Sequence, residues 1–484
     1  GADEIRAVTE KDPVAALDFL RETLSLPNDA SYPADIAKLL DWLEPQFQKR
    51  GFTTRRLPTG GNPVLFAERK TPNATKTALF YMHSDGQPVD PSRWEQPNPY
   101  VPVMKAQDAD GAWKIIDWPI EGAKFNPDWR VFARSSSDDK GQIAQFLLAI
   151  DALDRAKISP DINIKVFIDT EEEKGSPHIS DAVGPNRDLL AADLMLIFDG
   201  PPHASGKPTV TLGARGIATI TLTTYGPKTP QHSGHYGNFL PNPAFALARI
   251  LASMKDADGK VTITGYYDGV KLDKKTRAML AAVPEDEAAT LSRVKLAAPE
   301  RVASSLQEAL QYPSLNIRGM ASAWIGREAR TIIPADATAE IDIRTVKETP
   351  PERLVGLVKR HIEKLGYYVI DHEPTDDERM AHARLVRFNA EINYPAFRSD
   401  YDSSASVIAR SALSRLYGED PVVLRTGGGS VPISPFVGAL NVPAAIVSTV
   451  NLDNNQHSPN ENIRVGNFLD GIATMAAIMT TEAP

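Results

Sequence analysis

The chain has 484 residues, of which 24% are charged, and its formal net charge is −9 at pH 7. This length exceeds the usual size of one hydrophobic core, so we expect more than one domain. The negative charge and the absence of dense lysine or arginine tracts argue against a nucleic-acid partner, because phosphates would not be neutralised. No apolar run approaches the length that spans a bilayer, so no membrane partner is expected either.

The chain contains no cysteine. Disulfides, thiolate metal ligands and a cysteine nucleophile are therefore excluded, which leaves oxygen and imidazole as metal ligands. The acidic, cysteine-free chain starts at Gly1 without a methionine. We expect from this an exported, periplasmic bacterial protein, and a cytoplasmic location stays open.

The first two hundred residues alternate between strand and helix patterns. A continuous apolar run over 78–82 is typical of a strand that is buried on both faces. After Gly141, apolar residues recur at three- and four-residue spacing, which predicts a helix. Further strands are expected at 162–168 and 194–198. This alternation predicts an α/β fold with a mostly parallel sheet flanked by helices.

The middle of the chain has a different character. Polar and apolar residues alternate over 213–224, as in a strand with one exposed face, and a helix over 242–254 follows. The stretch 255–313 is rich in charge and has no clear period. A strand, a helix and a strand are expected after it, at 339–344, 351–365 and 367–370. We therefore predict three segments: a catalytic domain in two parts, 1–210 and 379–484, and a smaller inserted α+β domain, 211–378.

Acidic and histidine motifs adjoin several of these predicted strands. They are His83-Ser84-Asp85, Asp138-Asp139-Lys140-Gly141, Glu171-Glu172-Glu173, Asp199-Gly200 and His457. Side chains that follow adjacent strands converge at one edge of a sheet, and most of these motifs have that position. Two histidines and three carboxylates can bind two divalent metals that share one carboxylate. The residues therefore predict a dinuclear metallohydrolase.

Each motif also has an ordinary structural explanation. Asp138 precedes a predicted helix, where aspartate serves as an N-cap and complements the helix dipole. Three adjacent glutamates are compatible with a solvated acidic loop. His83, Asp199 and His457 are compatible with turns or loops. The strand-end positions and the chain order, taken together, favour the metal interpretation.

Longer motifs give a resemblance to a known family. They lie at 81–85, 137–141, 172–176, 231–234 and 427–432. Together they resemble the dinuclear zinc metallopeptidase family of carnosinases, cytosolic non-specific dipeptidase, aminoacylase, glutamate carboxypeptidase and succinyl-diaminopimelate desuccinylase, and they are most similar to the dipeptidase and carnosinase branch. The resemblance covers essentially the whole chain. It implies a zinc-exopeptidase-like catalytic domain and a lid and dimerisation domain at 211–378.

The resemblance also implies two divalent metal ions per chain. One ion would be bound by His83, Asp138 and Asp199, and the other by Asp138, Glu173 and His457, with Asp138 bridging the two. A water would lie between them. Zinc is the expected metal, although this set of oxygen and imidazole ligands also accepts manganese or cobalt.

The same resemblance assigns roles beside the metals. Glu172 would be the general base, and Asp85 would orient His83 through its other ring nitrogen. Sliding the glutamate run by one residue would make Glu171 the base and Glu172 the ligand; the following Gly175-Ser176 favours Glu172. A cis peptide bond is expected after the bridging aspartate, Asp138.

Substrate contacts are implied as well. His232 would reach the active site of a partner subunit in a homodimer and stabilise the oxyanion, and the nearby His235 stays open for that role. Arg344 would bind a substrate carboxylate as a bidentate partner, together with Ser430 and Gly429. The glycine-rich loop around Gly429 lacks the Lys-Ser/Thr pair of a nucleotide-binding loop.

Three functions are compatible with these residues. The leading prediction is hydrolysis of dipeptides or short peptides that have a free C-terminal carboxylate. The first alternative is an N-acyl-amino-acid deacylase or desuccinylase that uses the same metal site. The second is a non-catalytic binding protein on this scaffold, which is less favoured because every expected ligand and the base are present.

Overall fold

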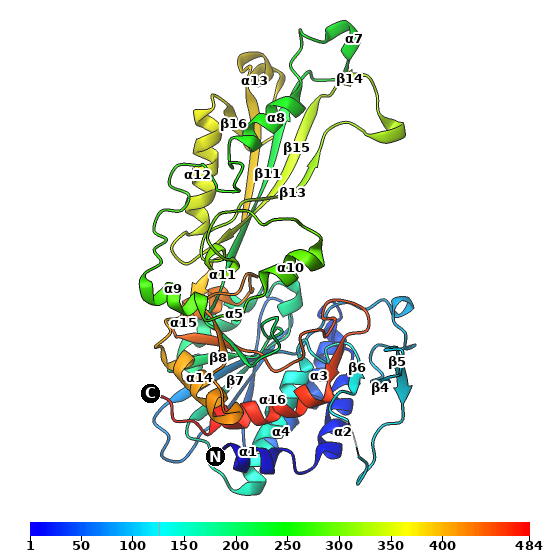
Figure 1. Cartoon of the computed structure of the whole chain (residues 1–484), viewed down its shortest axis with the longest axis vertical. Helices are drawn as coiled ribbons and strands as arrows, with labels where there is room; N and C mark the ends of the chain where they lie inside the picture. The colour runs from blue at the N-terminus through cyan, green and yellow to red at the C-terminus, as the bar shows by residue number, and fades with distance from the viewer. Residues whose placement is uncertain (125) are drawn as a thin grey trace.

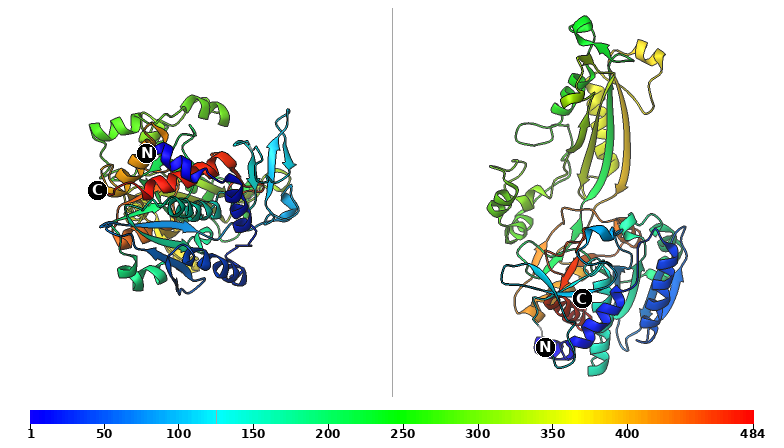
Figure 2. Two further views of the ribbon diagram at one scale, coloured as in Figure 1. Left: turned by 90° about the horizontal axis from the view of Figure 1, so that it is seen from below. Right: turned by 90° about the vertical axis from the view of Figure 1, so that its right-hand side faces the viewer.

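The computed structural model describes residues 1–124 and 126–484. The molecule has two lobes, and both termini lie in the lower one (Figure 1). The lower lobe is drawn in blue, cyan, orange and red, whereas the upper lobe is mostly green and yellow, so the upper lobe is an insertion in the chain (Figure 1). The right-hand view of Figure 2 shows the upper lobe standing away from the lower one.

An eight-stranded sheet forms the centre of the lower lobe. Its order is β1 (Thr53–Leu57), β2 (Val64–Arg69), β7 (Asn163–Asp169), β3 (Thr77–His83), β8 (Leu194–Ile197), β20 (Ala444–Val447), β9 (Thr209–Thr211) and β19 (Val422–Leu424). The central strands β7, β3, β8 and β20 run parallel, while β1, β2 and β9 add antiparallel pairings. The parallel arrangement predicted from the apolar runs is therefore right at the centre of a mixed sheet.

Helices cover both faces of this sheet. The helices of one face and its edge are α1 (Ala2–Thr9), α2 (Pro13–Leu24), α3 (Pro33–Gln48), α4 (Lys140–Ala156), α14 (Ser404–Tyr417) and α16 (Val465–Met479), and they contribute to the largest buried core. A second core on the other face includes residues of α5 (Ile179–Val183), α6 (Arg187–Leu190) and α15 (Ser434–Leu440). No helix in the described part of the chain is long and apolar enough to cross a membrane.

An aromatic cluster connects the strands that lead to the acidic motifs with the helix that begins there. The ring of Phe80 in β3 stacks on Phe198, directly after β8, with centroids 5.7 Å apart, and it packs edge-on against Phe146 of α4 at 5.3 Å. All three side chains are fully buried. Such pairs contribute about 0.5–1.5 kcal/mol beyond area burial. The cluster therefore holds β3, β8 and α4 in fixed relative positions.

A smaller antiparallel sheet joins the two parts of the lower lobe. It consists of β21 (Asn462–Arg464), β6 (Arg130–Phe132), β4 (Val103–Gln107) and β5 (Trp113–Ile116), in that order. The pairing of β21 with β6 brings the C-terminal part of the chain against the loop that precedes α4.

The upper lobe is a five-stranded sheet, which we call the lid sheet. Its order is β13 (Asn316–Ala321), β15 (Asp336–Thr345), β11 (Gly216–Tyr225), β17 (Leu385–Tyr394) and β16 (Tyr368–Ile370). The helices α8 (Pro243–Ala252) and α12 (Pro351–Lys364) pack on one face and form a separate core. Alternate residues of β11 and β15 are buried, as the period-two pattern of the sequence predicted.

The predicted return to the larger domain at residue 379 is too early. β17 pairs with β11 up to Tyr394, so it belongs to the lid sheet. Apolar and polar residues alternate over 386–394, which is typical of a strand, but this pattern does not show which of the two sheets the strand joins. The short pairing of β10 (Gly213–Ala214) with β18 (Phe397–Arg398) marks the two places where the chain passes between the lobes.

The stretch 255–313 contains the short helices α9 (Lys274–Ala281), α10 (Glu287–Val294) and α11 (Leu306–Ala309). The remaining elements are α7 (Ser233–Tyr236), α13 (Asp376–Ala381), β12 (Gln231–His232), β14 (Ile332–Ile333) and the 3-10 turns Pro91–Arg93, Glu172–Lys174, Gly184–Asn186 and Gly326–Glu328.

Candidate metal centre

The acidic and histidine motifs meet at the carboxyl edge of the central parallel strands. His83 is the last residue of β3, Asp199 follows β8 by two residues, and Glu172 and Glu173 follow β7. Asp138 precedes α4, whose first turn begins at Lys140. Parallel neighbouring strands end at one edge of the sheet, which is why residues so distant in sequence come together.

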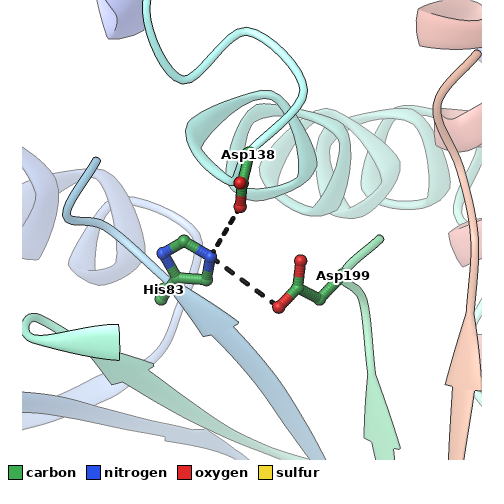
Figure 3. A group of neighbouring side chains, drawn as sticks. All are labelled: His83, Asp138 and Asp199. Atoms are coloured by element: carbon green, nitrogen blue, oxygen red, sulfur yellow. Dashed lines mark hydrogen bonds and ion pairs between the residues drawn. The ribbon is translucent and has the colours of Figure 1, made fainter. Parts of the chain in front are cut away.

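His83, Asp138 and Asp199 form a first group (Figure 3). The Nε2 atom of His83 lies 3.0 Å from Oδ1 of Asp138 and 3.8 Å from Oδ2 of Asp199. One potential ligand atom from each residue lies within 4.8 Å of the others. Burial, followed by the charge of Asp138, raises the pKa of Asp199 to about 7. A positive ion among these atoms would relieve that repulsion.

Asp138, Glu173 and His457 form a second group. The Nε2 atom of His457 lies 2.9 Å from Oδ2 of Asp138 and 3.2 Å from Oε2 of Glu173. Asp138 therefore presents Oδ1 to His83 and Oδ2 to His457, so one carboxylate serves both groups. This is the arrangement that a bridging carboxylate needs.

The donor set fits divalent metal ions. It consists of carboxylate oxygens and imidazole nitrogens, which suit zinc, manganese and cobalt. The Oε1 atom of Glu173 is buried and accepts no hydrogen bond from residues 1–124 or 126–484, so it has a free lone pair for a metal. Burial raises the pKa of Glu172 well above its ordinary value; the charge of His83 opposes this shift, and that of Asp199 adds to it.

Asp85 positions the loop that bears the two glutamates. Its Oδ1 and Oδ2 atoms accept hydrogen bonds from the backbone N–H groups of Glu172 (3.1 Å) and Glu173 (3.0 Å). The Nδ1 atom of His83 lies 3.1 Å from the backbone oxygen of Asp85 and 3.4 Å from its Oδ1. Asp85 therefore contacts His83 as expected, and it also holds the glutamate loop, which the sequence did not reveal.

The three adjacent glutamates face different ways. Glu171 accepts a hydrogen bond from the backbone N–H of Asn62 (3.1 Å) through Oε1, and its Oε2 lies 2.6 Å from Nδ1 of His178. In contrast, Oε2 of Glu172 lies 3.9 Å from Nε2 of His83. A third combination of candidate ligands, His83 with Glu172 and Glu173, is also close enough to bind an ion. The geometry agrees with the register in which Glu172 and Glu173 face the metal positions.

Sequence reasoning missed a buried glutamate that supports the loop before Asp138. Glu461 accepts hydrogen bonds from the side chain of Arg134 (2.8 Å) and from the backbone N–H groups of Ser135 and Ser137, both at 3.0 Å. These partners are more than 320 residues away in the chain, so no local pattern indicates the contact. The peptide bond between Asp138 and Asp139 is cis, as expected.

The predicted carboxylate-binding residues lie where the two lobes meet. Arg344, near the end of β15, donates a hydrogen bond from Nη1 to Oγ of Ser430 at 2.9 Å. The backbone oxygen of Gly429 accepts a hydrogen bond from the N–H of Arg215 at 3.0 Å. The structure thus brings Arg344, Ser430 and Gly429 together at the junction of the two lobes, which we call the hinge.

His232 is not brought to the metal-ligand groups within one chain. It belongs to β12, which pairs with β14, and both lie with α7 at the far end of the upper lobe (Figure 1). Its side chain is exposed, and its Nδ1 accepts a hydrogen bond from the N–H of Gly234. The ring of His235 is 4.4 Å away, so both histidines occupy the same outer position.

Comparison with known proteins identifies the family. Residues 79–481 match the sequence profile of Peptidase family M20/M25/M40. The chain belongs to this family. As an M20 peptidase it is a metal-dependent peptidase, and the fold and family expected from the motifs are confirmed.

Relatives of this M20 peptidase agree in fold and in length. It is 27% identical over 432 residues to Cys-Gly metallodipeptidase DUG1 of Saccharomyces cerevisiae, which covers 87% of this chain and 83% of the relative. It is 25% identical over 439 residues to the human Beta-Ala-His dipeptidase, covering 89% and 80% of the two chains. The structure of the M20 family metallo-carboxypeptidase Sso-CP2 from Sulfolobus solfataricus superposes with a TM-score of 0.75 at 26% identity, covering 96% of this chain and 99% of the other.

Metal binding to this M20 peptidase should release protons at pH 7. Ion pairs with Asp138 and Glu173 raise the pKa of His457 to about 10 in the metal-free protein, and a metal binds only the neutral ring. Protons therefore compete with the metal, so its apparent affinity should rise with pH up to about 10. Calorimetric titration with zinc in buffers of different ionisation enthalpy measures the release.

The matched control for this titration is His457→Gln, which should release fewer protons and bind less metal. A binding enthalpy that does not depend on the buffer would contradict the expectation.

Proposed function

We propose that this chain hydrolyses the amide bond of dipeptides or short peptides that have a free C-terminal carboxylate, with two divalent metal ions bound per chain. The observation that carries the proposal is that two groups of potential ligands share Asp138, with Glu172 beside them. The relatives that bear the names of Cys-Gly and Beta-Ala-His dipeptidases support the choice of dipeptides as substrates.

In this proposal, His83, Asp138 and Asp199 hold one metal ion, and Asp138, Glu173 and His457 hold the other. Zinc is the proposed metal, and manganese or cobalt would suit the same ligands. When bound, such ions polarise the scissile carbonyl and make an attacking water more acidic.

Glu172 acts as the general base. It takes a proton from the attacking water and gives it to the nitrogen of the leaving amine. A general base works best when its pKa lies near the working pH, and burial moves the pKa of this carboxyl group upward from its ordinary acidic value. The hydrogen bond that the backbone N–H of Glu172 donates to Asp85 keeps the carboxylate of Glu172 beside His83.

Arg344 and Ser430 bind the C-terminal carboxylate of the substrate, with the backbone around Gly429 beside them. A guanidinium group matches a carboxylate in two parallel hydrogen bonds. The existing hydrogen bond from Arg344 to Ser430 holds the guanidinium in place for that contact.

The proposed assembly is a homodimer through the upper lobe. This lobe exposes large apolar side chains: Phe239, Phe245, Ile317, Met320, Trp324 and Ile325. Exposed apolar surface and an uncovered edge strand such as β13 are typical of association sites. In the dimer, His232 would enter the partner's active site and donate to the oxyanion.

Glu172→Gln should lower the turnover of a dipeptide by roughly 10²–10⁴-fold, the usual scale for a general base, while both metals stay bound. Metal analysis and hydrolysis of alanyl-leucine measure the two effects. The control is Glu171→Gln, which changes the adjacent glutamate that binds Asn62 and should retain most activity. A large loss of turnover in Glu171→Gln alone would assign the role of general base to Glu171.

The same assay with N-acetyl-alanyl-leucine separates the substrate classes. Cleavage of the free dipeptide and not of the acetylated compound supports the proposal. Preference for the acetylated compound would assign a deacylase. Absence of metal under metal-replete conditions would overturn the metal assignment altogether.

Mixing His232→Ala with Glu172→Gln should restore part of the activity if each site uses a histidine from the other subunit. In a mixed dimer one site has an intact Glu172 and receives an intact His232. The measurement is activity against mixing ratio, under conditions in which subunit exchange is verified. Full exchange without any recovery would count against a shared site.

A further inference from the structure

Arg215 is a buried arginine with side-chain nitrogens that have no hydrogen-bond partner among the described residues. It directly precedes β11, where the chain enters the lid sheet, and only 6% of the residue is exposed. Its Nε and Nη2 atoms are buried, and none of the residues in the described ranges accepts a hydrogen bond from them. Burying an unpaired charge is costly, so such a group is expected to have a partner in the working protein.

Arg134 shows what a structural buried arginine looks like in the same protein. It is 3% exposed and its Nε also has no acceptor among the described residues, yet its Nη1 donates to the carboxylate of Glu461 and to the backbone oxygen of Ser458. For the buried Nε and Nη2 atoms of Arg215, residues 1–124 and 126–484 offer neither kind of acceptor.

A second arginine lies beside Arg215. Ile217 pairs with Arg344 in the β11–β15 register, and side chains two residues apart share a face, so Arg215 and Arg344 point to the same side of the lid sheet. Burial, followed by the charge of Arg344, lowers the pKa of Arg215 to about 10. The two guanidinium groups are therefore close enough to repel each other.

A single nearby carboxylate does not neutralise the charges of the two guanidinium groups. Asp342 lies on the same face, and its Oδ2 is 3.9 Å from Nε of Arg344. Its Oδ1 already accepts a hydrogen bond from Nδ2 of Asn316 at 2.8 Å. Two cations and one anion leave an excess positive charge at this place.

Both arginines are joined to the same glycine-rich loop. Arg215 donates its backbone N–H to the oxygen of Gly429 (3.0 Å), and Arg344 donates to Oγ of Ser430 (2.9 Å). A side-chain carbon built on Gly429 would have no described atom within 4 Å, so the space beside the loop is open. An anion bound beside this loop would be attracted by both positive charges.

We propose that Arg215 is a second cationic determinant of the subsite for the substrate's C-terminal carboxylate, and that it makes binding depend on a free carboxylate. This inference rests on the proposed function. A C-terminal amide would not supply the second anion that the two guanidinium groups lack, so Arg215 favours charged C-termini over neutral ones.

The test measures binding without turnover. In zinc-loaded Glu172→Gln protein, the Kd values of alanyl-leucine and alanyl-leucinamide are determined by calorimetry, and Arg215→Met is then added. The affinity for the free acid should fall by roughly 10- to 100-fold, the effect expected for one charge-assisted interaction, while the affinity for the amide changes by less than about threefold. Arg215→Lys should keep part of the preference because it retains the charge without the planar fork.

The matched control is Arg318→Met. Arg318 belongs to β13 of the same sheet, but it is half-exposed and lies 3.5 Å from Glu340. This variant should leave both Kd values unchanged. An equal loss for acid and amide in the Arg215 variants would mean a purely structural role, and no loss for the acid would overturn the proposal.

The proposed function is tested separately, by hydrolysis of alanyl-leucine with the wild-type protein. If hydrolysis fails while acid binding still depends on Arg215, the carboxylate subsite stands and the reaction must be reassigned. If the zinc-loaded protein binds neither compound, the subsite is wrong. If Arg215→Met does not fold, Arg215→Lys still tests the proposal, because it keeps the charge and most of the volume. Part of the preference for the free acid should then be lost.

Discussion

Mutual repulsion among buried carboxylates is the constraint on which this structure depends. Asp138, Glu172, Glu173 and Asp199 gather at one edge of a sheet whose central strands are buried, and His83 and His457 stand among them as potential cations. Burial opposes ionisation of Glu172 and Asp199, and the charges of neighbouring carboxylates add to that effect. Such an arrangement is stable with divalent cations bound, and the protein's framework keeps the ligands in place for them.

That framework comes from hydrogen bonds and packing at several levels. Asp85 holds the loop of Glu172 and Glu173 through their backbone N–H groups, and Glu461 does the same for the loop before Asp138. Beneath them, the aromatic cluster of Phe80, Phe146 and Phe198 fixes the strands and the helix to one another. Charged side chains thus fix the conformation of the loops, whereas apolar packing fixes the relative positions of the strands and the helix from which the loops extend.

The hinge has a second electrostatic imbalance, of opposite sign. Arg215 and Arg344 bring excess positive charge to the junction of the lobes, where both contact the glycine-rich loop. The two groups of potential metal ligands are acidic and would be neutralised by cations, whereas the hinge is basic and would be neutralised by an anion. A peptide with a free C-terminal carboxylate would neutralise the excess positive charge of the hinge, and its amide bond is the group that the metal site is proposed to cleave. The two imbalances therefore fit one kind of substrate.

The sequence by itself determined the elements and the chemistry of the metal site. Apolar runs located the central strands, and motifs of fixed spacing identified the family and every residue of the two ligand groups, because these signals are local in the chain. Tertiary structure alone decided which glutamate turns towards Asn62, that Glu461 supports the loop before Asp138, and that β17 pairs with β11 in the lid sheet. It also decided that Arg215 lies beside Arg344 with buried nitrogens that no described residue satisfies. These features depend on contacts between residues tens to hundreds of positions apart, and no local pattern of side chains records them.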